Sequence, residues 1–127
     1  MTAAAGTTVG FVTDIEGNLE YFDRWVASSE VLQYKPGSRE LEFTSERAHF
    51  VFGGDAMDRC DGSLRLCRRL VELKKRFPDR VWLIAGNRDL NKVRLTSELA
   101  PDELARPYQS IPGPHWDPSG ADTCPVP

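Results

Sequence analysis

The 127-residue sequence contains no apolar run long enough to cross a bilayer. No basic residue precedes the small apolar residues of its N-terminal segment, which argues against a secretory signal. Cysteine is scarce, and the three cysteines form no C-x-x-C pair, a pattern typical of reduced thiols rather than of a disulfide framework. These absences predict a cytoplasmic protein without a membrane partner.

The sequence also lacks an excess of basic residues, since its formal net charge is -3 at pH 7. Arginine and lysine do gather between positions 65 and 76, but they lie opposite an apolar stripe, as on any solvated helix. This balance argues against nucleic acid as a partner. With 40% hydrophobic and 28% charged residues, the composition is that of a globular domain.

Three short apolar runs, at Thr7–Asp14, residues 48–55 and Arg80–Asn87, alternate with two stretches of helical periodicity, at residues 18–32 and 62–77. Strand, helix, strand, helix, strand is the order of an α/β fold with a mostly parallel sheet. Because the strands are continuously apolar rather than alternating, we expect helices on both faces of this sheet.

The remaining segments carry weaker signals. A hairpin is predicted over residues 31–43, with its turn at Lys35–Ser38, and a further helix over residues 88–99. After Pro101 the periodicity fades and prolines accumulate. We therefore expect one α/β domain over residues 7–100 and a proline-rich irregular tail over residues 101–127.

Each apolar run ends in a short segment that combines glycine with acidic or amide residues. In chain order these segments read DIEGN, GGDAMDR and GNRD. Taken alone, each ending is typical of a turn or a helix cap. In a parallel sheet, however, all three carboxyl ends meet at one edge, where α/β proteins bind their ligands. The set of three therefore predicts a functional site.

Carboxylates that converge on one site repel one another unless positive charge lies between them. Asp, Glu and Asn oxygens suit Mg²⁺ or Mn²⁺, and also Zn²⁺ or Fe when imidazole joins them. One carboxylate can bridge two ions roughly 3.5–4 Å apart, a geometry that clamps a phosphoryl group and activates water. Arg59 follows the second strand and is placed to bind a phosphate oxygen through its planar fork.

These stretches resemble the motifs of the calcineurin-like metallophosphoesterases, which read D-x-H, G-D-x-x-D-R-G and G-N-H-[ED] in the same order. The resemblance covers residues 9–89 and implies the N-terminal half of a metallophosphoesterase-type α/β sandwich. It also implies a phosphatase-type hydrolase that acts on a phosphorylated substrate through two divalent metal ions. The metal ligands carried over by position are Asp14, Glu16, Asp55 and Asn87. Asp58 and Arg59 would shape the site, with Arg59 toward the phosphate.

The sequence departs from this pattern at three positions. Glu16 stands where the family has a metal-binding histidine, and Cys60 replaces a glycine. Arg88 stands where the family has the histidine that assists the leaving group. An arginine cannot donate a proton at neutral pH, although it can stabilise phosphoryl charge. We therefore group Arg88 with Asp58 and Arg59 as the catalytic candidates.

Histidines that complete the second metal site in the family lie downstream, and this sequence has only two histidines. His49 precedes the acidic end of its strand and is expected to be structural, while His115 is a surface or packing residue unless the tail approaches the site. The domain is therefore expected to be incomplete, as in a truncated isoform or a gene-model fragment. The alternative is a catalytically degenerate protein that binds a metal or a phosphorylated ligand.

Overall fold

The computed structural model of the chain describes residues 6–107 and residue 110. Two compact units are present, one extending to Val93 and the other beginning at Arg94, and each is described by itself. No helix within the described residues is long and apolar enough to cross a membrane. The expected division at residue 100 stays a prediction.

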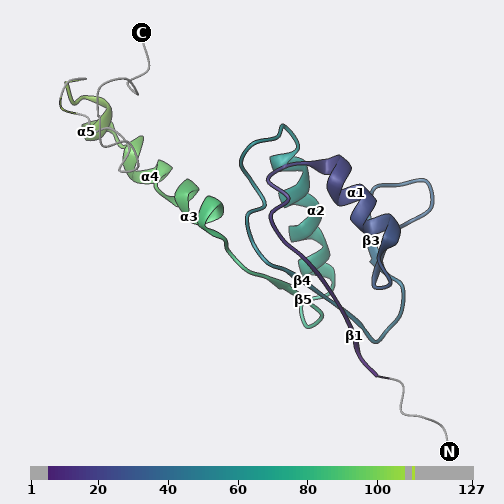
Figure 1. Cartoon of the computed structure of the whole chain (residues 1–127). Coiled ribbons are helices and arrows are strands. Elements are labelled where there is room, and N and C mark those ends of the chain that lie inside the picture. The colour runs from purple at the N-terminus through teal and green to yellow at the C-terminus, as the bar shows by residue number, and fades with distance from the viewer. Residues whose placement is uncertain (1–5, 108–109, 111–127) are drawn as a thin grey trace, which may run out of the picture. The chain divides into compact units, whose positions relative to one another are not determined.

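The first unit is built on a parallel sheet of three strands (Figure 1), β1 (Thr8–Val12), β4 (Ala48–Phe52) and β5 (Val81–Leu83). β4 lies in the centre, and its register pairs Thr8 with Ala48 on one side and Phe50 with Val81 on the other. The predicted α/β fold with a parallel sheet is thus confirmed.

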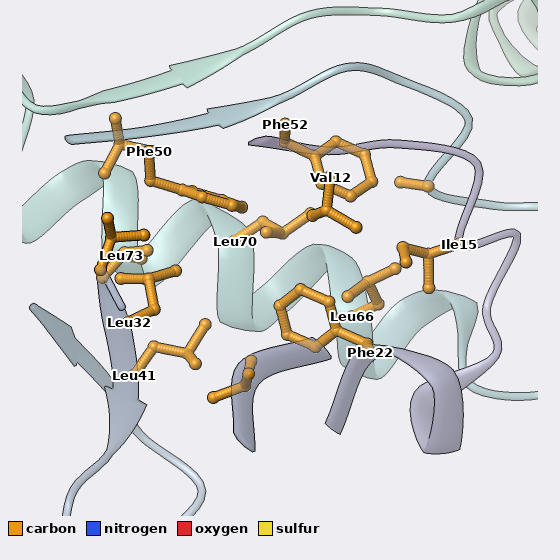
Figure 2. Close-up of a cluster of buried hydrophobic side chains, with 14 of the residues drawn as sticks. Val12, Ile15, Phe22, Leu32, Leu41, Phe50, Phe52, Leu66, Leu70 and Leu73 are labelled. Atoms are coloured by element: carbon orange, nitrogen blue, oxygen red, sulfur yellow. The ribbon is translucent and has the colours of Figure 1, made fainter. Parts of the chain in front are cut away.

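Two helices cover one face of the sheet. α1 (Leu19–Ser28) begins after Asn18, whose Oδ1 accepts a hydrogen bond from Tyr21 N at 3.0 Å, as the predicted N-cap requires. α2 (Ser63–Arg76) buries Leu66, Leu70 and Leu73, spaced so that they share one helical face. Figure 2 shows Val12, Phe50 and Phe52 pointing from the strands toward α2, with Phe22 of α1 below.

The opposite face of the sheet differs from the prediction of helices on both faces. Burial alternates along β4, and Val9, Phe11 and Trp82 on that face are 57%, 57% and 45% exposed. Apolar residues occupy both faces of these strands, so the sequence pattern alone suggests burial on both sides. Among the described residues the core lies on the helical side.

A hairpin of β2 (Leu32–Tyr34) and β3 (Leu41–Phe43) lies between the two helices in sequence, as predicted. α3 (Asn87–Val93) follows β5 and closes the first unit. The second unit contains α4 (Leu95–Glu98) and α5 (Pro101–Leu104), so the first residues of the expected irregular tail form a helical turn. Most of that tail lies outside the described residues.

Candidate functional site

Hydrogen bonds between β1 and β4 continue past the ends of both strands. Gly53 N donates to Val12 O at 2.8 Å, Asp14 N donates to Gly54 O at 3.0 Å, and Glu16 N donates to Asp55 O at 2.9 Å. The two acidic loops are therefore fixed to each other by backbone contacts. The convergence that parallel strands predicted is present at the carboxyl edge of the sheet.

Three acidic residues at this edge have left-handed backbone conformations. The φ angles of Asp14, Glu16 and Asp55 are 55°, 47° and 56°. They are the only non-glycine residues with positive φ in the part of the chain that the structure describes. Such conformations cost about 1–3 kcal/mol each and cluster at functional sites. Their concentration at adjacent strand ends therefore makes this edge the candidate site.

Asp55 occupies the centre of the site and is 9% exposed. Its Oδ1 accepts a hydrogen bond from Arg88 N at 2.9 Å. In the amide orientation that satisfies both groups, Asn87 donates to Asp55 Oδ2 at 2.9 Å. The backbone approaches closely here, because a Cβ added at Gly86 would lie 2.0 Å from Asp55 Oδ1. The residues that follow β5 are therefore packed against those that follow β4.

Asp89 holds the start of α3 against β4. Its carboxylate accepts hydrogen bonds from the backbone N–H groups of Asp55 at 2.8 Å, Ala56 at 3.0 Å and Gly86 at 3.0 Å. The sequence suggested only an acid in the first turn of a helix. This clamp depends on a contact across 34 residues, which no local pattern signals.

Five charged side chains form an alternating network beside Asp55, which we call the strand-end network. Arg59 Nε lies 3.0 Å from Glu16, whose other oxygen lies 4.0 Å from Arg88 Nε. Arg88 Nη1 lies 3.3 Å from Asp58, and Lys92 Nζ lies 3.2 Å from the second oxygen of the same carboxylate. In chain order the members are Glu16, Asp58, Arg59, Arg88 and Lys92.

The positive charges in this network keep Asp58 ionised. The pKa of Asp58 lies below its ordinary value, first because Lys92 donates a hydrogen bond to it and further because Arg88 and Arg59 carry positive charge nearby. The sequence prediction included Asp58, Arg59 and Arg88 but missed Lys92. The signal that could have found Lys92 is its spacing, four residues after Arg88 on a predicted helix.

The predicted metal ligands lie at one edge but make protein contacts. Glu16 is paired with Arg59, Asp55 accepts from Arg88 and Asn87, and the Asp14 side chain is exposed. Within the described residues, no three His, Cys, Asp or Glu side chains form a ready metal site. The carboxylate and amide donors nonetheless suit a hard divalent ion. A bound ion would compete with Arg59 for Glu16.

The other residues considered from the sequence lie elsewhere or in the loops. His49 is in the N-terminal half of β4, and its ring stacks on Trp82 with centroids 5.4 Å apart. Cys60 is exposed, and its backbone N donates to Glu16 O at 2.9 Å. His115 lies outside the described residues.

Comparison with known proteins agrees with these strand-end motifs. The serine/threonine-protein phosphatase sitA of Aspergillus fumigatus is 40% identical over 57 residues, which make up 45% of this chain and 14% of that protein. No solved structure matches the chain. Residues 7–121 match the calcineurin-like phosphoesterase family. Because this match covers most of the chain and includes all three strand ends, the chain belongs to the calcineurin-like phosphoesterase family.

Proposed function

We propose that this chain binds a phosphate ester at the carboxyl edge of its sheet and hydrolyses it with the help of divalent metal ions. One observation carries the proposal: three acidic residues at two adjacent strand ends are held in left-handed conformations, next to three basic side chains. A strained acidic edge with cations beside it suits a metal and an anion together.

The residues that would hold divalent ions are Asp14, Glu16, Asp55 and Asn87. When bound, such an ion supplies a Lewis acid and lowers the pKa of a bound water. Asp55 is the central ligand in this proposal, because it is buried and contacts the third strand end. These oxygen donors suit Mn²⁺ or Mg²⁺, whereas Fe or Zn²⁺ would suit the site if an imidazole joined them.

Arg59 and Arg88 would bind the phosphate oxygens. Their guanidinium groups lie on either side of Glu16, at 3.0 and 4.0 Å, so both reach the same small region. A guanidinium stays protonated at neutral pH and cannot give a proton to a leaving alkoxide. Esters with acidic leaving groups, such as aryl phosphates, are therefore the substrates that this site would hydrolyse most readily.

Metal binding is tested by thermal unfolding. A ligand that binds only the folded state stabilises it, so Mn²⁺ or Mg²⁺ should raise the melting temperature of the wild type. Asp55→Asn should abolish this rise, measured against the melting temperature of the same variant without metal. Asp61→Asn is the matched control, because Asp61 is exposed and pairs with Arg65 on α2. An equal rise in wild type and Asp55→Asn would refute the proposed ligand set.

A second candidate function is phosphate binding without catalysis. It is favoured by the ion pairs of Glu16, since the arginines already neutralise a side chain that the metal requires. Hydrolysis assays separate the two functions. Aryl phosphate turnover that stops on adding a chelator supports the hydrolase, whereas anion binding without turnover of either aryl or alkyl phosphates supports the binding protein.

A further inference from the structure

Lys92 lies on the same side of α3 as Arg88, one helical turn further along. Both side chains contact Asp58, with Arg88 Nη1 at 3.3 Å from one oxygen and Lys92 Nζ at 3.2 Å from the other. Asp89 fixes this helix to the backbone after β4 through two hydrogen bonds, from Asp55 N and Ala56 N, so the position of Lys92 follows from the sheet edge. Neither the sequence motifs nor the family pattern assigns a role to Lys92.

The strand-end network carries a surplus of positive charge. Three cations (Arg59, Arg88 and Lys92) face two carboxylates (Glu16 and Asp58), so its formal charge is +1. Without Lys92 the remaining four side chains would sum to zero. The same holds for either arginine, but Lys92 is the cation that adds positive charge to the four residues of the sequence motifs.

Exposure shows which sign of charge faces solvent. The carboxylates of Glu16 and Asp58 are 20% and 23% exposed, whereas Arg88 and Lys92 are 38% exposed and Arg59 is 72% exposed. The acids thus lie beneath the cations that they pair with. An incoming anion meets the basic groups first, and each of them has N–H donors in excess of those used by the ion pairs.

We propose that Lys92 is the third cation of the phosphate site and that it selects doubly charged phosphate monoesters over singly charged diesters. This inference rests on the proposed phosphate site and adds a substrate class to it. The physical reason is that the interaction with every cation scales with the charge of the ligand, while Glu16 and Asp58 already balance the charges of the two arginines. The charge of Lys92 is then the one that this network leaves unbalanced.

A different role for Lys92 would be to anchor α3 through Asp58. Two substitutions separate these roles. Lys92→Gln keeps a hydrogen-bond donor for Asp58 but removes the charge, whereas Lys92→Arg keeps the charge. If Lys92 only anchored the helix, neither substitution would change the ratio of affinities for two ligands of different charge.

The test uses phosphonates, whose P–C bond resists hydrolysis, as probes for titration calorimetry of the full chain in Mg²⁺ buffer. Phenylphosphonate carries two negative charges at mildly alkaline pH, and its monomethyl ester carries one. We expect the wild type to bind phenylphosphonate about tenfold more tightly than the ester. Lys92→Gln should bring the two affinities together, while Lys92→Arg should keep the preference. Lys75→Gln, on the outer face of α2, is the control and should keep it as well.

The outcomes distinguish the role of Lys92 from the proposed phosphate site on which it rests. A preference that disappears only in Lys92→Gln supports the inference. A preference that persists in Lys92→Gln, or a wild type without preference, overturns the inference and leaves the phosphate site standing. A wild type that binds neither phosphonate overturns both.

Discussion

The strand-end network and a second charged cluster differ in the backbone conformation of the residues that form them. The second, which we call the hairpin cluster, contains Asp23 of α1, Tyr34 of β2, Arg69 of α2 and Arg39 of the hairpin turn. Asp23 accepts hydrogen bonds from Tyr34 Oη, from Arg39 at 2.7 Å and from Arg69 at 3.1 Å. These residues have no left-handed backbone, in contrast to Glu16 and its neighbours.

Burial of the cations differs between the two clusters. In the hairpin cluster Arg39 is 66% exposed, but Arg69 is 16% exposed beside Asp23 at 27%, so one arginine lies inside and its charge is satisfied there. In the strand-end network the cations are the more exposed partners. We conclude that the hairpin cluster joins α1, β2 and α2, and we propose that the strand-end network presents charge to a ligand.

The hairpin cluster also borders a cavity. A cavity of about 600 Å³ is lined by Arg39 and Arg69 of the hairpin cluster. Left-handed backbone at acidic residues is found at the strand ends instead. The three predictions that follow test this contrast between a ligand site and a structural cluster.

The largest effect is expected where the strand ends pack most tightly. At Gly54 φ is +106°, and an added Cβ would lie 2.5 Å from Gly86 N, so Gly54→Ala should lower the free energy of unfolding by about 3 kcal/mol or more. Gly37 in the hairpin turn also has positive φ, at +72°, but has no atom within 4 Å of an added Cβ. Gly37→Ala should therefore cost about 1 kcal/mol. Urea unfolding measures the free energy of unfolding of both variants. Equal losses of stability would show that the strand ends are no more tightly packed than the hairpin turn.

An intermediate effect, on the affinity for phosphate, is expected when the carboxylate that pairs with the two arginines is removed. Glu16→Gln removes the carboxylate that engages Arg59 and Arg88, which frees both for an anion. Without metal, this variant should bind inorganic phosphate about tenfold more tightly than the wild type does. Glu40→Gln is the control, because Glu40 pairs with Lys35 and Arg76 near the hairpin cluster. Titration calorimetry with a chelator present measures the phosphate affinities. Weaker binding by Glu16→Gln would contradict the claim that Glu16 occupies the two arginines.

The smallest effect is a pH dependence confined to the hairpin cluster. Burial and then the hydrogen bond to Asp23 raise the pKa of Tyr34 to about 12. The folded state therefore favours the neutral phenol. The resulting stabilisation is fully present below about pH 10, where the phenol of the unfolded chain titrates, and is lost as pH rises toward 12.

Tyr34→Phe isolates this contribution. The difference in unfolding free energy between wild type and variant should narrow between about pH 9 and pH 11 by about 1 kcal/mol, a value reduced for the partial exposure of the ring. Chemical unfolding at the two pH values measures it. A constant difference would show that the Asp23 contact does not favour the protonated form. Phosphate binding at neutral pH should be the same in both proteins.

Local patterns were sufficient to predict the strands and the two long helices of the first unit, and the convergence of the polar strand ends. Residues close together in the sequence are enough to indicate the N-cap at Asn18, the apolar stripe of α2 and the three polar strand ends. Parallel strands then place those ends together as a matter of topology. The convergence of Glu16, Asp58, Arg59 and Arg88 was predictable for this reason.

Features set by tertiary contacts were not predictable in the same way. Lys92 reaches Asp58 across 34 residues only because Asp89 fixes α3 to the backbone after β4. Aspartate adopts the left-handed conformation more often than most residues do, but it does so in a small minority of cases, so residue type alone does not predict the conformations of Asp14, Glu16 and Asp55. The open face of the sheet was missed because its apolar residues resemble those of the buried face.

The continued ladder between β1 and β4 has a consequence for folding kinetics. Partners in this ladder are separated by 40 residues, as in the pairing of Val12 with Phe52, so the chain must close a long loop before the pairing is made. Asp14 and Glu16 donate to Gly54 and Asp55 in the extension of the same ladder. Local folding of either loop therefore cannot assemble the acidic edge, which forms only after the slow, long-range docking of the two strands.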